Sequence, residues 1–452
     1  MEKMNKFKEV SESYTMAEAI AEAQRCLNCK VPQCKKGCPI GNDIPEWIHE
    51  FSKGNIGNAI SIIRAKSNLP AVCGRVCAHE KQCQGACILG KQGNNINIGK
   101  LERFIADFDA SLKLTHSDVP VKNRGRVAVI GSGPAGLTVS GDLARKGFHV
   151  EIFDMEREAG GVLMYGIPEY RLPKEVVRRE VALIEELGVV IHTNTTVGED
   201  LTIDDLFSQG FDAVFVGTGA SRPRGLDIPG KDTAGVAMAT HFLRRVQLYQ
   251  DGLVGRNEVV VKPGDKVYVV GCGNTAMDAA RTALRMGART VDVVYHRTID
   301  RMAALRSEYD EAVEEGVRFN WNADIIEVQA DDNGNMTQLV LQTKVADPTE
   351  ENPDNMREER KTLGADVILL AVGAQPATKA IKSTEGINVD EKGFMLTRET
   401  PYGMTSRRGV FAGGDVANRQ ATVVHAMRDA KMVAEGIAQY IDAVKLIESI
   451  NL

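Results

Sequence analysis

The sequence predicts an α/β protein in which a small helical domain precedes two nucleotide-binding folds, and three observations lead to this prediction. Eight of the nine cysteines lie within residues 26–87, a stretch with little strand character. A glycine-rich loop at 131–136 directly follows an apolar strand pattern, and a second such loop at 271–276 follows another. A helix and a further strand come after each loop, which is the order of a Rossmann-type βαβ unit.

The length and net charge of the chain further limit the class of protein that it can be. The 452 residues exceed what one hydrophobic core usually supports, so about three domains are expected. A formal net charge of −6 gives no basic footprint, and nucleic acid is therefore not an expected partner. No apolar run reaches bilayer length, and Met1–Val10 is too charged for a signal peptide. We expect a cytoplasmic protein without membrane contact.

The amino-terminal domain is predicted from short helical patterns and two cysteine runs. Thr15 and Glu18 have capping-box spacing, and Ile44–Phe51 and Ile56–Ile63 also have helical patterns. The runs are Cys26-x2-Cys29-x4-Cys34-x3-Cys38-Pro39 and Cys73-x3-Cys77-x5-Cys83-x3-Cys87. Thiolates so close in sequence can bind one metal centre, and a reducing compartment favours metal over disulfides.

Iron–sulfur clusters are favoured over zinc and over structural thiols. Zinc sites commonly use paired Cys-x2-Cys motifs, whereas only one is present here. The closing Cys38-Pro39 is typical of ferredoxin runs, although a ferredoxin has x2 where this run has x4. Structural thiols are disfavoured because eight cysteines fall within 62 residues. Eight cysteines could fill two four-iron sites, or one of them could be a bystander.

The first nucleotide fold begins at a predicted strand over 126–130. Gly131, Gly133 and Gly136 follow this strand in GxGxxG spacing, and Asp154 ends the next strand. Such glycines permit a tight turn and let the backbone approach a pyrophosphate at the helix N-terminus. The acid is placed to bind ribose hydroxyls.

The second nucleotide fold repeats this order with a different ending. The loop 271–276 follows a strand over 267–270, and the second strand, Thr290–Tyr295, ends at His296 and Arg297 instead of an acid. A cation at this position suits a 2′-phosphate, which indicates NADP rather than NAD. The alternative is a solvated basic turn.

Three further segments are typical of a flavoprotein. Residues 213–220 and 367–373 each form an apolar strand pattern that ends in a glycine turn. Residues 409–416 bring Asp415 to a helix that begins near Thr422. An acid delivered to a helix N-terminus could hold a ribityl chain.

These motifs resemble a known family over essentially the whole chain. The chain is similar to the small subunit of NADPH-dependent glutamate synthase and, equally, to the large subunit of the electron-bifurcating NADH-dependent ferredoxin:NADP oxidoreductase. The amino-terminal part of dihydropyrimidine dehydrogenase is a more distant likeness. The resemblance rests on residues 26–39, Gly74–Cys77, Ile98–Glu102, Gly160–Pro168, Asn274–Asp278 and Gly413–Asp415.

The resemblance implies two [4Fe-4S] clusters beside a discontinuous FAD domain of the glutathione-reductase type, with an NADPH domain inserted in it. The expected parts are a helical cluster domain at 1–122, the FAD domain at 123–246 and 377–452, and the NADPH domain at 247–376.

The resemblance also implies the residues of each site. One cluster would take Cys26, Cys29, Cys34 and Cys87, and the other Cys38, Cys77, Cys83 and Glu102, with Cys73 as a bystander. The alternative for Glu102 is an acid on a helix surface. FAD would lie on Gly131, Gly133, Pro134, Ala135, Gly136, Asp154, Gly161, Val162, Leu163, Gly219, Gly414, Asp415, Thr422, Val423 and Val424. NADPH would lie on Gly271, Gly273, Asn274, Thr275, His296 and Arg297.

The implied function is electron transfer. NADPH would reduce FAD, and the clusters would pass single electrons to a partner in a hetero-oligomer, with no catalytic acid or base required. The partner would be the large subunit of glutamate synthase or, alternatively, a ferredoxin:NAD-type flavoprotein subunit in electron bifurcation.

Two other functions are disfavoured. Thioredoxin-reductase-like chemistry needs a cysteine pair beside the flavin, but only Cys272 lies outside the cluster region, and it is interpreted as a small apolar filler. A non-enzymatic cluster-bearing assembly or binding protein is disfavoured because both glycine loops are intact.

Overall fold

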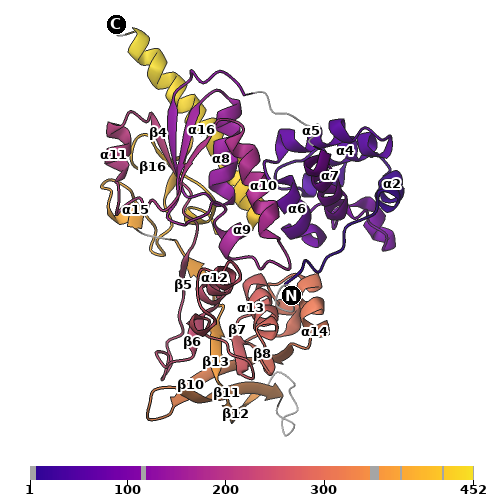
Figure 1. The fold of residues 1–452 in the computed structure, drawn as a ribbon, viewed down its shortest axis with the longest axis vertical. Helices are drawn as coiled ribbons and strands as arrows, with labels where there is room; N and C mark the ends of the chain where they lie inside the picture. The colour runs from indigo at the N-terminus through magenta and orange to yellow at the C-terminus, as the bar shows by residue number, and fades with distance from the viewer. Residues whose placement is uncertain (1–6, 113–118, 347–355, 377–378, 420–421, 451–452) are drawn as a thin grey trace. The chain divides into compact units, whose positions relative to one another are not determined.

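The structure is a computed structural model, and it describes residues 7–112, 119–346, 356–376, 379–419 and 422–450 (Figure 1). The segment Met1–Val10, which was expected not to be a signal peptide, lies partly outside these residues. No helix in the described part of the chain is long and apolar enough to cross a membrane. The chain forms two compact units. One comprises the described residues within 9–164, 171–221 and 375–450, and the other those within 7–8, 165–170 and 222–374.

The first unit begins with the expected helical domain. Its helices are α2 (Met16–Gln24), α3 (Gln33–Gly37), α4 (Ile44–Ser52), α5 (Ile56–Lys66), α6 (Pro70–Val76) and α7 (Ile98–Leu112), with the 3₁₀ turns η1 (His79–Lys81) and η2 (Ile88–Gln92). Residues 7–112 contain no strand. The capping box is confirmed, because the Thr15 hydroxyl and the Glu18 carboxylate each bind the other residue's backbone N–H. Trp47 and Phe51 are fully buried in this domain.

A seven-stranded sheet forms the rest of this unit. Its order is β15 (Thr397–Glu399), β16 (Tyr402–Thr405), β17 (Val410–Ala412), β4 (Ala213–Val216), β1 (Arg126–Ile130), β2 (His149–Phe153) and β3 (Val190–His192). Strands β17 to β3 run parallel, with Val127 opposite Val150 and Ala213. Because β17 pairs with β4, two distant parts of the chain build one sheet, as expected for a discontinuous domain.

Helices α8 (Pro134–Arg145), α10 (Lys174–Glu185) and α16 (Val423–Ile450) connect this sheet to the helical domain. The Asn68 side chain donates to Asp142 Oδ1 at 2.8 Å, and Arg179 pairs with Asp107 at 2.7 Å. The sulfur atoms of Cys73 in α6 and Met427 in α16 are 3.6 Å apart. The helical domain is thus fixed to the sheet domain within one unit.

The second unit has its own parallel sheet, in the order β6 (Val236–Met238), β13 (Val367–Leu370), β7 (Lys266–Val270), β8 (Thr290–Tyr295) and β9 (Arg318–Trp321). Helices α12 (Ala239–Gln250), α13 (Asn274–Arg285) and α14 (Arg306–Glu314) belong to this unit. A second, antiparallel sheet joins β10 (Ala323–Ala330), β11 (Met336–Ala346) and β12 (Met356–Gly364). The predicted fold class is confirmed, with two nucleotide-binding folds after a helical domain.

Two short segments from elsewhere in the sequence complete the second unit. Phe7 is 7% exposed in the core of this unit, and Tyr170 is fully buried there. The ring of Tyr170 lies 4.9 Å from the guanidinium of Arg281 and 3.8 Å from that of Arg285. Its hydroxyl donates to the carbonyl of Asp278 at 3.3 Å. The core of this unit therefore includes residues far from 222–374 in sequence.

Candidate cluster and nucleotide sites

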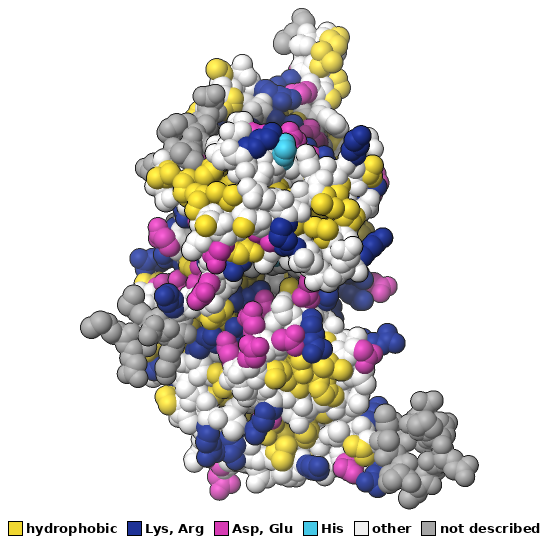
Figure 2. All heavy atoms as spheres, turned by 90° about the vertical axis from the view of Figure 1, so that its right-hand side faces the viewer, with side chains coloured by type: hydrophobic (Ala, Val, Ile, Leu, Met, Phe, Trp, Pro, Cys, Tyr) yellow, Lys and Arg dark blue, Asp and Glu magenta, His cyan; other side chains and the backbone are white. Residues whose placement is uncertain are grey.

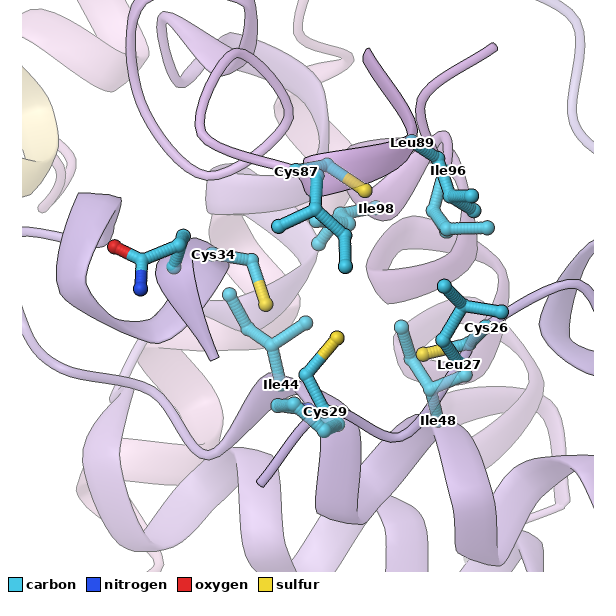
Figure 3. A pocket seen from close by; sticks show the side chains of 13 residues that line it. Cys26, Leu27, Cys29, Cys34, Ile44, Ile48, Cys87, Leu89, Ile96 and Ile98 are labelled. Atoms are coloured by element: carbon cyan, nitrogen blue, oxygen red, sulfur yellow. The ribbon is translucent and has the colours of Figure 1, made fainter. Parts of the chain in front are cut away.

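Four cysteines from separate turns surround the first thiol site. Cys26 and Cys29 follow α2, Cys34 lies in α3, and Cys87 directly precedes η2. Figure 3 shows their sulfur atoms around one common space. Apolar side chains complete its lining, among them Leu27, Ile44, Ile48, Ile88, Leu89, Ile96 and Ile98. The structure thus brings together the four cysteines that the resemblance implies for one cluster.

The second thiol site is more buried. Its pocket is lined by four cysteines and one acid, Cys38, Cys73, Cys77, Cys83 and Glu102. The other lining residues are Pro39, Ile40, Asn42, Ile44, His79, Gln82 and Val424. The remaining predicted ligands therefore also lie together. Val424 belongs to the first turn of α16, so this pocket reaches the helix that follows Asp415.

Burial favours the neutral thiol at several of the cysteines in the two pockets, and it raises the pKa of Cys26. Burial raises the pKa of Cys34 and of Cys38 to about 11, and it raises that of Cys83 as well. Because the thiolate is the metal ligand, binding of a metal must release these protons. A four-iron cluster would be held by thiolates that each bind a different iron atom, and the four sulfur atoms in Figure 3 lie around one common space. Across the described residues, no three Cys, His, Asp or Glu side chains form a group that could hold a single metal ion.

Glu102 and Cys73 are the two alternatives for the last position of the second site. Glu102 in α7 is 8% exposed, so it is not a surface acid. Burial, and then the nearby Glu180, raise its pKa to about 8. The thiol of Cys73 is 2% exposed and lies 3.7 Å from Ser67 Oγ. It also lies 3.6 Å from the sulfur of Met427 and hydrogen-bonds with the thiol of Cys77, so Cys73 lies beside a predicted ligand of this site.

His79 is a further candidate that sequence reasoning missed. Its ring lines the second pocket, and its Nε2 atom is buried without a hydrogen-bond partner in the described structure. Burial lowers its pKa to about 4, so the ring is neutral and able to bind a metal. A Cβ on Gly99 would lie 2.3 Å from the His79 ring, so the absence of a side chain at Gly99 leaves room for this ring. The only sequence signal is its place two residues after Cys77.

The first glycine loop has the geometry of a pyrophosphate cradle. Gly131 has a φ of +95°. A Cβ on Gly136 would lie 1.8 Å from the carbonyl oxygen of Gly131, so the third glycine permits close packing of helix on strand. Gly133, the N-cap of α8, has open space at its Cβ position and no side chain that caps the helix. A Cβ on Gly161 would lie 2.8 Å from Gly133 Cα, so the predicted 161–163 segment meets this loop.

Asp154 forms hydrogen bonds with the first glycine loop, which precedes it in the sequence. Its Oδ2 accepts the backbone N–H of Ser132 at 2.6 Å, and its Oδ1 accepts that of Glu156 at 2.8 Å. It is 6% exposed, and burial raises its pKa. Asp154 therefore positions the loop.

Asp415 lies in a turn that packs against the same loop. A Cβ on Gly414 would be 2.9 Å from that of Ala135, at the start of α8 beside Pro134. Burial, and then Asp429, raise the pKa of Asp415 to about 6. Asp429 was missed by sequence reasoning, although it accepts the Gly414 N–H at 2.6 Å and the Tyr402 hydroxyl at 3.0 Å. Asp429 is buried within α16, and its role in holding this turn depends on that burial.

The other residues predicted for FAD lie at the ends of elements in the same unit. Gly219 follows β4 with a φ of +66°, and Val162 is exposed at the start of the short helix α9 (Val162–Tyr165). Leu163 is buried, and its carbonyl accepts Lys174 Nζ at 3.0 Å. Thr422 precedes α16, which begins with Val423 and the buried Val424.

The second glycine loop repeats the cradle in the other unit. A Cβ on Gly271 would lie 2.4 Å from the carbonyl oxygen of Ala371, whereas Gly273 has open space. Asn274 Oδ1 accepts the N–H of Leu305 at 3.0 Å, and Thr275 is exposed in the first turn of α13. Cys272 is buried and burial raises its pKa to about 12, as fits a neutral filler.

Two cations remain available at the end of β8. His296 and Arg297 are exposed, and neither forms an ion pair with a described residue. The nearby Arg301 pairs with Asp300 at 3.7 Å, and Arg306 pairs with Asp310 at 2.9 Å.

The sheets, the glycine loops and the thiol pockets define an NAD(P)-dependent flavin oxidoreductase with an iron–sulfur domain. Residues 125–430 match the family model described as pyridine nucleotide-disulphide oxidoreductase, and residues 3–114 match the one described as dihydropyrimidine dehydrogenase domain II, 4Fe-4S cluster. The chain belongs to the pyridine nucleotide-disulphide oxidoreductase family, in the group that includes the small chains of NADPH glutamate synthase.

Relatives match along the whole length. The glutamate synthase [NADPH] small chain of Halomonas elongata is 36% identical over 96% of this chain and 93% of its own. The glutamate synthase [NADPH] small chain of Escherichia coli K12 is 33% identical over 96% of this chain and 94% of its own. The NAD-dependent dihydropyrimidine dehydrogenase subunit PreT of the same organism is also 33% identical, over 98% and 99%.

Solved structures share the fold. Mycobacterium tuberculosis FprA in complex with NADPH has a TM-score of 0.56 at 17% identity, covering 71% of this chain and 85% of its own. Thioredoxin reductase of T. acidophilum has a TM-score of 0.53 at 21% identity, over 70% and 98%.

Proposed function

We propose that this chain takes electrons from NADPH and passes them through FAD and two [4Fe-4S] clusters to a partner subunit of the glutamate synthase type. The observation that carries this proposal is the place of α16. Its start lies in the predicted FAD segment, and its Val424 lines the second thiol pocket. The proposed flavin and cluster sites thus share one helix end, as an electron path requires.

The FAD-binding residues are those predicted from the sequence, from Gly131 to Val424. Bound FAD would supply the chemistry, since it accepts a hydride and returns electrons singly. The residues of the chain would position the bound FAD. Asp154 and Asp429 hold the two turns, and Gly133 leaves room for the pyrophosphate. Lys174 fixes the Leu163 carbonyl from within the core.

The cluster ligands are proposed as Cys26, Cys29, Cys34 and Cys87 for one site and Cys38, Cys77, Cys83 and Glu102 for the other. NADPH is proposed to lie on the loop from Gly271 to Thr275, with its 2′-phosphate at His296 and Arg297. The four-part division into 1–122, 123–246, 247–376 and 377–452 stays a prediction, and in the structure 222–246 packs in the unit that contains 247–374. The cytoplasm is the proposed compartment. Hetero-oligomer formation is proposed because the similar proteins named above are small chains.

Anaerobic purification with iron, sulfide and zinc assays tests the cofactor content. We expect about eight iron and eight acid-labile sulfide per chain, and a flavin spectrum that NADPH bleaches. Zinc without sulfide would overturn the cluster assignment. A flavin that dithionite bleaches but NADPH does not would overturn the electron path while leaving the cofactors in place.

Single substitutions test the last ligand of the second cluster. Glu102→Ala is expected to change the spectrum of one cluster and to leave FAD bound, whereas Cys73→Ala leaves both clusters unchanged. His79→Ala is the matched variant for the imidazole in the same pocket. If Cys73→Ala or His79→Ala produces the spectral change and Glu102→Ala does not, the ligand assignment is wrong.

A further inference from the structure

The segment 296–305 joins β8 to α14, and main-chain hydrogen bonds tie it to the rest of its unit. The carbonyl of Arg297 accepts the N–H of Asn322, which follows β9, at 3.1 Å. Further along the segment, the N–H of Ala304 donates to the carbonyl of Cys272 in the second glycine loop at 3.0 Å. The segment is therefore held against the loop that forms the proposed nucleotide cradle.

Two side chains from outside the segment hold it at two further points. The hydroxyl of Tyr295, the last residue of β8, donates to the carbonyl of Arg301 at 2.9 Å. Asn274 Oδ1 accepts the N–H of Leu305 at 3.0 Å. Tyr295 is 9% exposed, and the centroid of its ring lies 4.8 Å from that of the His296 ring, in a T-shaped arrangement. Tyr295 thus holds the middle of the segment and also contacts the ring at its start.

These four hydrogen bonds leave the basic side chains of the segment available. His296 and Arg297 are exposed, and neither forms an ion pair with a described residue. Arg301 contributes only its carbonyl, while its guanidinium pairs with Asp300. The main chain is therefore fixed beneath two basic side chains, which is the arrangement of a preorganised anion site.

A broad basic surface is not the source of anion binding on the face drawn in Figure 2. There the lysines and arginines are scattered among aspartates and glutamates and form no single basic area. The net charge of −6 gives no overall attraction for an anion either. A phosphate must then be recognised by individual side chains. Ordering such side chains on binding lowers affinity, so a segment that is already held binds more tightly.

We propose that Tyr295 is a positioning residue for the 2′-phosphate of the nucleotide, because it holds the segment 296–305 in its binding conformation before the nucleotide arrives. This inference rests on the function proposed above and adds a residue that determines the nucleotide preference of the same site. Tyr295 need not touch the phosphate. It acts through the main chain of Arg301 and through the ring of His296.

Titration calorimetry of the holoprotein with 2′,5′-ADP and 5′-AMP tests the inference, since these two nucleotides differ only in the 2′-phosphate. We expect the wild type to bind 2′,5′-ADP more tightly. Tyr295→Phe keeps the ring and loses only the hydroxyl. It is expected to weaken 2′,5′-ADP about three- to tenfold, as for the loss of one ordinary hydrogen bond, and to leave 5′-AMP unchanged.

Two further variants separate positioning from a merely structural role. Tyr268→Phe removes a hydroxyl from β7 of the same unit and is expected to change neither affinity. Arg297→Ala removes a side chain that the segment presents, so adding Tyr295→Phe to it is expected to cost much less than Tyr295→Phe alone. Fully additive losses in this double variant would overturn the positioning role.

The remaining outcomes distinguish this inference from the proposed function. Equal weakening of both nucleotides in Tyr295→Phe, with a lower temperature of thermal unfolding, would show that Tyr295 supports the fold, and the inference would be wrong. A wild-type preference for 2′,5′-ADP that Tyr295→Phe retains would overturn the inference alone. A wild type that binds both nucleotides equally would overturn the 2′-phosphate site itself, and with it the assignment of NADPH.

Discussion

Arg297 decides, in our proposal, which nicotinamide cofactor is preferred. It is exposed at the end of β8 and has no ion pair among the described residues. A hydrogen bond to a charged group contributes about 1.5–3 kcal/mol, which corresponds to roughly ten- to a hundredfold in affinity. We expect Arg297→Ala to weaken NADPH by that factor and to leave NADH nearly unchanged.

Anaerobic stopped-flow reduction of the flavin by each nucleotide measures this difference. Arg301→Ala, at a cation that already pairs with Asp300, is the matched control and should change neither. Equal losses of NADPH and NADH in Arg297→Ala would mean that the arginine supports the shared part of the nucleotide or the fold. The relative PreT, named as NAD-dependent, makes this measurement informative for the whole group.

Asp415 should make stability depend on pH in the FAD-free protein. Its pKa is about 6 in the folded chain, against about 3.9 when unfolded. Its contribution to the free energy of unfolding is therefore fully present below about pH 4 and is lost as the pH rises through 6. The side chain in Asp415→Asn is always neutral. We therefore expect the free energy of unfolding of this variant at pH 8 to exceed that of the wild type by up to about 3 kcal/mol. Urea unfolding at pH 4 and pH 8 checks this, and a gap that is equal at both values would contradict it.

Some site residues could be predicted from the sequence and others could not. The cysteines were predictable because few residue types bind soft metals and their spacing is short. His79 and Asp429 were not, because their importance comes from burial and from neighbours distant in sequence. Glu102 was reached only through the resemblance, since nothing in its own segment distinguishes a buried acid from a surface one.

The turn between β1 and α8 separates two roles of glycine. Gly136→Ala would place a Cβ 1.8 Å from the Gly131 carbonyl oxygen, so we expect it to destabilise the fold by several kcal/mol. Gly133→Ala meets open space, so the FAD-free protein should keep its stability while FAD affinity falls, because the methyl group occupies the pyrophosphate's approach. Thermal unfolding and FAD titration of both variants measure the two effects. Loss of stability in Gly133→Ala would show that the loop is not a free cradle.

Elements with clear periodicity were predictable, and those set by long-range pairing were not. The strands β1, β2, β7 and β8 follow from short apolar runs before and after each glycine loop. Strand β12 has the sequence MREERKTLG, whose charged residues favour a helix, yet it pairs with β11 over its whole length. Pairing with a neighbouring strand overrides weak local preference there.

At the scale of the whole molecule, Tyr170 ends a short segment, 165–170, that belongs to one unit although the chain before and after it belongs to the other. It is fully buried in the core of the unit that contains 222–374. Tyr170→Ala is expected to lower the free energy of unfolding of that unit by about 3–5 kcal/mol. Tyr170→Phe removes only the hydrogen bond to Asp278 and should cost about 1 kcal/mol. Urea unfolding followed by Trp321 fluorescence measures both, and a small effect of Tyr170→Ala would mean that the segment only covers the unit.

The presence of Phe7 and Tyr170 in that core also has a consequence for synthesis on the ribosome. A chain grows from its amino terminus, and domains usually fold as each is completed. Here Phe7 and Tyr170 emerge long before Val367, which packs in the same core. Both segments can therefore pack in this core only after translation has passed β13. A gene fragment that encodes only 222–374 would yield a polypeptide without two of its own core side chains.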